Sequence, residues 1–308
     1  MKILYVANAR LPTEKAHGIQ IMKACEAFVC AGHELTLVVP ARTSPIKENP
    51  FTYYGIKTTF PLKRLFTIDT VGLGMIGYVW QSISFGKMAT FYAWFHASDV
   101  IYGRDEMVLA IVSLFTRRPL IWESHDGSWN IWARMVARRA SGIVVVTRGA
   151  IDFYREKGIP GEKLLAVSNG IDLDDFAHPE SQEVARTRLG LLHGQKIALY
   201  IGKLDGWKGV DTLLEAAKLL PADIKVAIIG GEKEQVEKLS AQNPTVTFLG
   251  YRPYAELPDN QAAADVLVVP NTAKDPVSVK FTSPLKLIAA LASGRPVVVS
   301  DLPSTRSV

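Results

Sequence analysis

The chain has 308 residues, of which 48% are hydrophobic and 21% are charged, and its formal net charge is +5. This length is enough for two ordinary domains, and the apolar content excludes a disordered chain. The small positive excess suits an anionic ligand or an acidic membrane surface, and it gives no reason to expect a nucleic acid partner.

The start of the chain and its cysteines bear on the compartment. The sequence MKILYVANAR leads directly into a predicted strand, without a signal peptide. Cys25 and Cys30 lie in one predicted helical stretch, where their spacing suits neither a disulfide nor a CxxC metal site. Both observations fit a reducing compartment, so we expect a cytoplasmic protein.

The first residues predict a strand–helix–strand unit and therefore a parallel sheet. The expected elements are a strand at 3–7, a helix at 19–29 that stops at Gly32, and a strand at 35–39. The loop from Asn8 to Gly18 lacks the GxGxxG pattern, which disfavours a dinucleotide-binding dehydrogenase. Lys15, His17 and Gly18 lie near the helix start, at the carboxyl edge of the sheet, where a ligand can bind.

The most apolar segment runs from Val71 to Phe95, and its length approaches that of a membrane span. It contains four glycines and the polar residues Gln81, Ser82, Ser84 and Lys87. These polar residues disfavour a transmembrane helix. We expect a buried helix pair inside the first domain, with a surface-lying segment on anionic lipid as the alternative.

The strand–helix alternation then resumes. Further strands are expected at 100–102, 120–122, 143–146 and 164–167, with helices between them. The first domain therefore has six or seven strands. Its boundary is predicted in SNGIDLDDFAHPE, which is rich in turn residues.

His125 stands at the carboxyl end of one of these strands, beside Asp126 and Gly127. Open α/β sheets bind ligands at that edge. A neutral imidazole there can hydrogen-bond a sugar hydroxyl or a phosphate. The alternative is a solvated loop histidine.

Asp172 and Asp174 form a DxD pattern, which can hold a divalent metal on a nucleotide sugar. They follow Asn169 and Gly170 at the expected hinge, and a helix start follows them, where acidic residues are favoured for another reason. We therefore predict no metal site at this pattern.

The stretch from Tyr200 to Ala217 reads as strand, loop and helix. Lys203 and Lys208 lie in the loop, on either side of Gly206. Two lysines around a glycine-bearing turn at a strand end can hold a diphosphate, because the cations are mobile and the backbone is free to approach closely. The alternative is a loop with two solvated lysines.

Strands at 225–229, 246–249, 266–269 and 297–300 continue the second half. The stretch FTSPLKLIAALASG predicts a helix with Ser283 as N-cap, Pro284 at the first helical position and Gly294 after its end. Its amino end is then ready to receive an anion through the amides of Leu285 and Lys286.

Several segments of the sequence, taken together, resemble a known protein family, although no single segment is decisive. They are LPTEKAHGIQIMK, HDGSW, VSNGIDLDDF, GKLDGWKGVDTLLEA, FLGYRPYAEL, and DVLVVPN followed by TSPLKLIAALASGRPVVVSDLPS. In order and spacing they resemble a retaining glycosyltransferase of the family-four, group-one type. The resemblance implies an α/β fold of the GT-B kind, with two Rossmann-like domains facing a cleft. It implies an acceptor-side domain at 1–170, a hinge at 171–190 and a nucleotide-sugar domain at 191–308 that is incomplete.

The resemblance also implies roles for the candidate residues. Lys203 and Lys208 would grip the donor diphosphate, and His125 would contact the transferred sugar. The expected donor-binding residues are Gly18, Tyr251, Arg252, Pro253, Ser283, Leu285 and Lys286. The family's paired glutamates are replaced by Phe281 and Ala289. Loss of the second one removes a charge-assisted hydrogen bond to the ribose, worth about 1.5–3 kcal/mol.

The implied activity is hexosyl transfer, with retention, from a UDP- or GDP-type sugar to a glycan, a lipid or a small molecule in cell-envelope polysaccharide biosynthesis. No cofactor or metal is expected, because lysines neutralise the leaving diphosphate. The enzyme would be cytoplasmic and peripheral at the inner face of an anionic membrane. Two alternatives stay open: a non-catalytic nucleotide-sugar-binding relic or scaffold, and a nucleotide-sugar epimerase of the same architecture.

Overall fold

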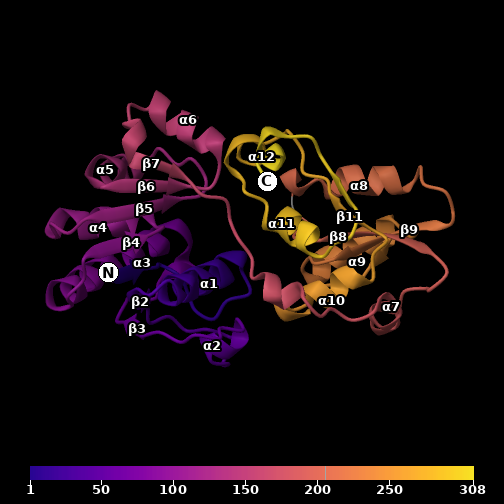
Figure 1. The fold of residues 1–308 in the computed structure, drawn as a ribbon, viewed down its shortest axis with the longest axis horizontal. Coiled ribbons are helices and arrows are strands. Elements are labelled where there is room, and N and C mark those ends of the chain that lie inside the picture. Colours follow the sequence, from indigo (N-terminus) through magenta and orange to yellow (C-terminus); the bar gives the residue numbers. More distant parts are fainter. Residues whose placement is uncertain (205) are drawn as a thin grey trace. The chain divides into compact units, whose positions relative to one another are not determined.

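A computed structural model of the chain describes residues 1–204 and 206–308. Asp205, in the predicted diphosphate loop, lies outside the described residues. The chain divides into two compact α/β units (Figure 1). The first comprises 1–145 and 151–166, and the second comprises 146–150 and 167–308.

The first unit is built on a seven-stranded parallel sheet in the order β3-β2-β1-β4-β5-β6-β7. Its strands are β1 (Lys2–Val6), β2 (Glu34–Pro40), β3 (Leu62–Leu65), β4 (Val100–Gly103), β5 (Leu120–Ser124), β6 (Gly142–Val145) and β7 (Leu164–Ala166). Its helices are α1 (Ala16–Cys30), α2 (Pro50–Tyr53), α3 (Gly74–Phe95), α4 (Glu106–Phe115), α5 (Ile131–Arg139) and α6 (Arg148–Glu156), the last of which begins in the segment grouped with the second unit.

Helices cover both faces of this sheet. The chain steps one way from β1 to β2 and the other way from β4 to β5, so right-handed crossovers put α1 and α4 on opposite faces. On one face Met22 and Cys25 of α1 pack into a core with Tyr5 and Leu37. On the other face α3 packs against α4, and α4 against α5. The strand order reverses between β1 and β4, which is where such sheets form a ligand crevice.

The second unit has a five-stranded parallel sheet in the order β10-β9-β8-β11-β12. Its strands are β8 (Lys196–Ile201), β9 (Ile224–Ile229), β10 (Thr247–Phe248), β11 (Val266–Val269) and β12 (Val297–Val299). Its helices are α7 (Gln182–Leu189), α8 (Val210–Ala217), α9 (Lys233–Gln242), α10 (Leu257–Ala262), α11 (Leu285–Ala292) and α12 (Pro303–Arg306). Here the order reverses between β8 and β11, so the loops after these two strands flank the switch point.

The predicted alternation of strands and helices is confirmed in both halves, and the first sheet has seven strands. Two local expectations are wrong, and one strand was missed. The 71–95 segment is not a buried helix pair: it is the single helix α3 after a short 3₁₀ turn at Val71–Leu73, and part of α3 is exposed. His17 and Gly18 belong to the first turn of α1 and not to the preceding loop. The edge strand β3 was not predicted.

Among the described residues, none of the helices combines the length and the apolar character that crossing a membrane requires.

Candidate functional site

The candidate residues fall into two groups, one in each unit. In the second unit they gather around the loop after β8. Gly209 has a φ of 77°, and a Cβ there would lie 1.7 Å from the carbonyl oxygen of Pro270, so only glycine fits. The amide of Thr272 donates to the carbonyl of Trp207 at 2.9 Å. The loops after β8 and β11 are thereby held together at the switch point.

Both predicted lysines lie in the first of these loops. Lys203 is exposed, and Lys208 is half-buried, with its ammonium 3.4 Å from the centre of the Trp207 ring. The phenol of Tyr200 donates to the carbonyl of Lys203 at 2.5 Å. Tyr200 is fully buried, so it ties the loop to the core of the sheet.

Lys286 joins this group from α11. Its ammonium is 3.4 Å from the Tyr200 hydroxyl and 4.7 Å from the centre of that ring. Burial, together with the positive charge of Lys208, lowers the pKa of Lys286 to about 7. Because two cations repel unless an anion lies between them, this arrangement favours binding of a diphosphate.

The amino end of α11 differs from the prediction in one detail. The helix begins at Leu285 with Pro284 as N-cap, so Ser283 is not the N-cap. The Ser283 hydroxyl instead accepts from the amide of Asn169 at 3.0 Å, and the Asn169 side chain donates to the Ser283 carbonyl. The first intrahelical bonds come from Leu287 and Ile288, so helix geometry leaves the Leu285 and Lys286 amides available to an anion. Gly294, with a φ of 67°, follows the helix end as predicted.

Tyr251, Arg252 and Pro253 follow β10, beside the end of β9. The amide of Gly230, just past β9, donates to the carbonyl of Gly250 at 2.8 Å. Tyr251 is exposed, and the buried Nε of Arg252 has no hydrogen-bond partner among residues 1–204 and 206–308. This segment therefore lies at the same carboxyl edge as the lysines.

Asn271 is a site residue that the sequence analysis missed. It follows β11, its exposure is 2%, and neither atom of its side-chain amide has a hydrogen-bond partner within the described part of the chain. A buried amide without partners is costly, which is why such groups gather at binding sites. Its place after the apolar run VLVV was visible in the sequence, but its burial was not.

In the first unit His125 follows β5, and Glu123 in that strand orients it. Nε2 of His125 lies 2.7 Å from Oε1 of Glu123. Arg104 donates to both oxygens of the same carboxylate, at 2.8 and 3.1 Å, and the Tyr102 hydroxyl donates at 2.9 Å. Glu123 and Arg104 are partners that the sequence analysis did not name.

The ionisation of Glu123 fixes the orientation of the ring. Burial opposes its charge, but the hydrogen bond from His125 and the Arg104 guanidinium outweigh burial and lower the pKa of Glu123 to about 2. An ionised carboxylate only accepts hydrogen bonds, so Nε2 of His125 carries the proton that it donates. Nδ1 is then the ring atom left for a substrate hydroxyl.

Gly18 is packed tightly inside the first unit. A Cβ there would lie 2.2 Å from the Tyr54 hydroxyl, which donates to the Thr13 carbonyl at 2.8 Å. Close packing of the first turn of α1 against Tyr54 thus requires glycine at this position.

The DxD pattern has a local structural role. Asp172 is the N-cap of the short 3₁₀ turn Leu173–Phe176, and its carboxylate accepts from the Asp174 amide at 3.1 Å. Among residues 1–204 and 206–308, no three His, Cys, Asp or Glu side chains gather as metal ligands. Phe281 and Ala289, where the resemblance leads us to expect a pair of glutamates, are 7% and 2% exposed.

Comparison with known proteins identifies the family. A model described as Glycosyltransferase Family 4 matches residues 18–175, which is just over half of the chain. The chain belongs to glycosyltransferase family 4. A second model, Glycosyl transferases group 1, matches residues 195–308.

Two named glycosyltransferases are similar to the chain over different lengths. The chain is 25% identical to TuaC of Bacillus subtilis, a glycosyltransferase named for teichuronic acid biosynthesis, over all of this chain and 83% of TuaC. It is 33% identical to D-inositol 3-phosphate glycosyltransferase 1 of Catenulispora acidiphila, over 46% of this chain and 36% of that protein.

A solved structure has the same fold. Anabaena Alr3699/HepE, in complex with UDP and glucose, superposes with a TM-score of 0.76 at 20% identity, covering 99% of this chain and 82% of HepE. The predicted GT-B fold is therefore confirmed for this family 4 chain.

Proposed function

We propose that the protein transfers a hexosyl group from a nucleoside diphosphate sugar to an acceptor, with retention of configuration and without a metal ion. The observation that carries the proposal is the cation cluster of the second unit. Lys208 and Lys286 lie beside the amino end of α11, at the switch point of the sheet. Such a site neutralises a diphosphate leaving group, whose charge grows as the glycosidic bond breaks.

Each group has a place in this mechanism. Lys203, Lys208 and the Leu285 and Lys286 amides hold the two phosphates. Lys286 takes up a proton as the diphosphate binds, because its pKa is about 7 without a ligand. The leaving phosphate accepts the acceptor's proton on the same face of the sugar, so no protein nucleophile is used.

The first unit supplies His125. Its Nδ1 contacts a hydroxyl of the transferred sugar, while Nε2 stays bonded to Glu123 at 2.7 Å. Tyr251, Arg252 and Pro253 border the nucleotide base, and Gly18 lets the loop after β1 approach the phosphates. We propose no cofactor, because the nucleotide sugar donor is a substrate of the reaction.

We assign a UDP- or GDP-type donor and a glycan or lipid acceptor in cell-envelope polysaccharide biosynthesis. The name of TuaC and the UDP and glucose bound by HepE support these assignments. The proposed location is the cytoplasm, at the inner face of the membrane.

The test is incubation of the protein with a panel of UDP-, GDP- and ADP-sugars, with detection of released nucleoside diphosphate. Turnover with one donor class, unchanged by EDTA, is the expected result, and NMR of the product should show the donor's anomeric configuration. Turnover lost in EDTA and restored by manganese would overturn metal independence. Tight donor binding without turnover on any acceptor would favour the non-catalytic alternative.

A further inference from the structure

The first unit has an exposed apolar surface on α3 that the proposed reaction does not use. Ile76, Trp80, Phe91 and Trp94 recur at the spacing of one helical side, and each is more than half exposed. Phe95 and Phe115 extend this surface past the end of the helix, with exposures of 78% and 59%. The Trp94 indole donates to the Phe115 carbonyl at 2.9 Å, so the ends of α3 and α4 lie side by side. We call these six residues the aromatic stripe.

Large apolar side chains that gather on one exposed side of a helix often mark a protein or membrane interaction site. The stripe is also free of acidic groups, because the sequence has no Asp or Glu between Thr70 and Ser98. The one charged residue in that segment is Lys87, which is exposed and lies between Trp80 and Phe91 along the same side of α3.

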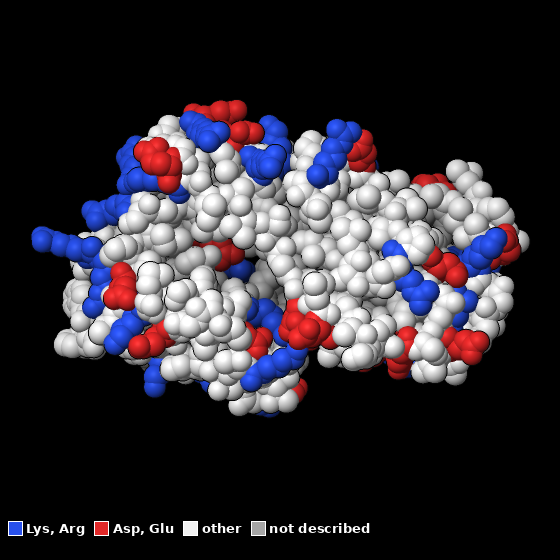
Figure 2. Space-filling model, in the orientation of Figure 1, with Lys and Arg blue, Asp and Glu red and all other residues white. Residues whose placement is uncertain are grey.

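An arginine lies at the carboxyl end of the stripe, where Arg118 donates to the carbonyls of Ala93 and His96. Within the first unit, the stretches 107–122 and 127–145 contain five arginines and no Asp or Glu. Figure 2 shows Lys and Arg side chains along the margin of the first unit that carries α4 and α5. The surface is therefore apolar along α3 and cationic beside it.

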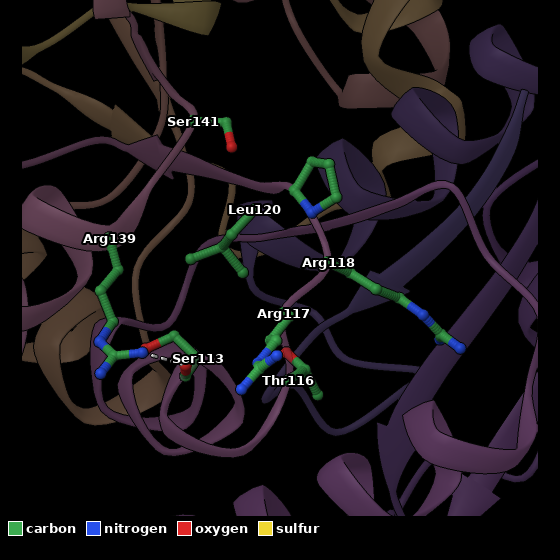
Figure 3. A pocket seen from close by; sticks show the side chains of 8 residues that line it. Ser113, Thr116, Arg117, Arg118, Leu120, Arg139 and Ser141 are labelled. Carbon is green, nitrogen blue, oxygen red and sulfur yellow. Dashed lines mark hydrogen bonds between the residues drawn. The ribbon is translucent and has the colours of Figure 1, made fainter.

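A pocket of about 340 Å³ opens within this cationic region (Figure 3). Its lining residues are Ser113, Thr116, Arg117, Arg118, Pro119, Leu120, Arg139 and Ser141. Two of its arginines are held by helix ends: Arg139 donates to the Ser113 carbonyl at 2.8 Å, and Arg118 donates to the carbonyls of Ala93 and His96. We call this the arginine pocket.

The third arginine of the pocket is available to a ligand. No hydrogen bond or ion pair of Arg117 is found among residues 1–204 and 206–308, and no carboxylate lines the pocket. The pocket is also remote from His125. Leu120 begins β5 and His125 follows its end, so the strand separates them by roughly 16 Å.

We propose, building on the membrane location proposed above, that this face docks on the surface of an anionic lipid bilayer. The aromatic stripe lies among the lipid headgroups with α3 parallel to the surface, and the arginine pocket takes a lipid phosphate. Tryptophan and phenylalanine favour the headgroup level, where one part of the ring is apolar and the other is wet. Each nearby cation adds attraction to anionic lipid.

Charge argues against a second copy of the chain as the occupant. A two-fold interface would bring the same face of both copies together, with their arginines opposed and no acidic partner among them. An anionic surface satisfies both the rings and the arginines.

The test is co-sedimentation of the intact chain with phosphatidylcholine vesicles and with vesicles containing phosphatidylglycerol. Binding to the anionic vesicles, weakened by salt, is the expected result. The double variant Trp94→Ser, Phe95→Ser should lower partitioning by about tenfold or more, and Arg117→Glu by about fivefold or more.

Matched controls come from the second unit. Leu219→Ser removes an apolar group that is 85% exposed, and Lys233→Glu reverses a charge on α9, and both should bind vesicles as the parent does. Unchanged nucleoside diphosphate affinity in every variant shows that the protein is folded and keeps the donor site separate from this test.

Three results would overturn the proposal. The first is equal binding to neutral and anionic vesicles, and the second is vesicle binding that the stripe and pocket variants leave unchanged. The third is a dimer, seen by sedimentation equilibrium, that the double variant Trp94→Ser, Phe95→Ser dissociates without any change in vesicle binding. That result would make a second copy the occupant of the face.

Discussion

Oε1 of Glu123 lies 2.7 Å from Nε2 of His125, and this contact sets which nitrogen of the ring faces outward. Glu123 is in turn held by two bonds from Arg104 and one from Tyr102. The imidazole is thus fixed before any substrate arrives, and catalysis gains from groups that need no reorientation.

Replacing Glu123 by glutamine should impair turnover more than donor binding. The amide matches the carboxylate in size but lacks its charge, so it holds His125 and Arg104 less firmly. We expect kcat to fall by about tenfold or more, with nucleoside diphosphate affinity unchanged, because the diphosphate groups belong to the second unit. His125→Ala should have an equal or larger effect on kcat. A fall in affinity with constant kcat would contradict the positioning role.

The Glu123 carboxylate should also make the free energy of unfolding depend on pH in the acid range. Its folded pKa of about 2 lies below the ordinary value of 4.5, so the unfolded chain binds the proton more tightly. The stabilising contribution, on the order of 3 kcal/mol, is present above pH 4.5 and is lost as the pH falls toward 2. Urea unfolding from pH 6 to pH 3 measures it. Glu123→Gln should flatten this part of the curve, and a parallel curve for the variant would refute the assignment.

Lys208→Ala should weaken nucleoside diphosphate binding by more than about tenfold, because a charge-assisted contact to phosphate is removed. Lys203→Ala should have a similar or smaller effect. Calorimetric titration measures both, with Lys233→Ala on α9 as a lysine control outside the cluster. Unchanged affinity in both loop variants would remove the diphosphate site from this loop.

Donor binding should also depend on pH through Lys286. With a pKa of about 7 in the unliganded protein, this lysine must take up a proton to bind phosphate at higher pH. Above pH 7, Kd for a nucleoside diphosphate should rise toward about tenfold per pH unit. Calorimetry in buffers of different ionisation enthalpy should detect the proton uptake. Lys286→Arg keeps its charge and should flatten the dependence; the same slope in that variant would exclude Lys286 as its source.

The accompanying stability effect of Lys286 has the same sign as that of Glu123, because both folded pKa values are lowered, but it falls in a different pH window. The folded pKa of Lys286 lies below its ordinary value of 10.5, so the unfolded chain binds more protons between about pH 7 and 10.5. The free energy of unfolding of the unliganded protein should therefore rise with pH across that window from this group.

The parts of the fold that the sequence predicts are those with local signals. Apolar runs such as 197–201 and 266–269 specify buried parallel strands, and Gly294 marks the end of α11. The short edge strand β3 has no such run, because Lys63 and Arg64 interrupt it. The segment of α3 has apolar residues on every side and buries the polar Gln81 and Ser82, so its sequence pattern cannot tell which side of the helix is covered and which remains exposed.

The candidate site likewise has contacts that the sequence could predict and contacts that it could not. Glu123 and His125 are two residues apart at the end of one strand, so their side chains point to the same side and their contact was within reach of the sequence. The bond between Ser283 and Asn169 joins residues 114 positions apart, and no local pattern encodes it. That bond draws Ser283 away from the capping position that its residue type predicts.

Asn271 allows a test in which stability and binding move in opposite directions. Its buried amide has no partner among the described residues. Asn271→Leu therefore replaces this unsatisfied amide with an apolar side chain that branches at the same atom. The unliganded protein should become more stable, by on the order of 1 kcal/mol. Donor affinity should fall by about tenfold, because the amide is the group that a bound nucleotide sugar would satisfy.

Asn260 provides the matched control in the same unit. It is equally buried, but its side-chain oxygen accepts from Arg188 at 2.9 Å. Asn260→Leu should therefore lower the melting temperature, because it leaves an arginine bond unmade, and it should leave donor affinity unchanged. If Asn271→Leu lowered the melting temperature as Asn260→Leu does, the Asn271 amide would be a structural group and not part of the donor site.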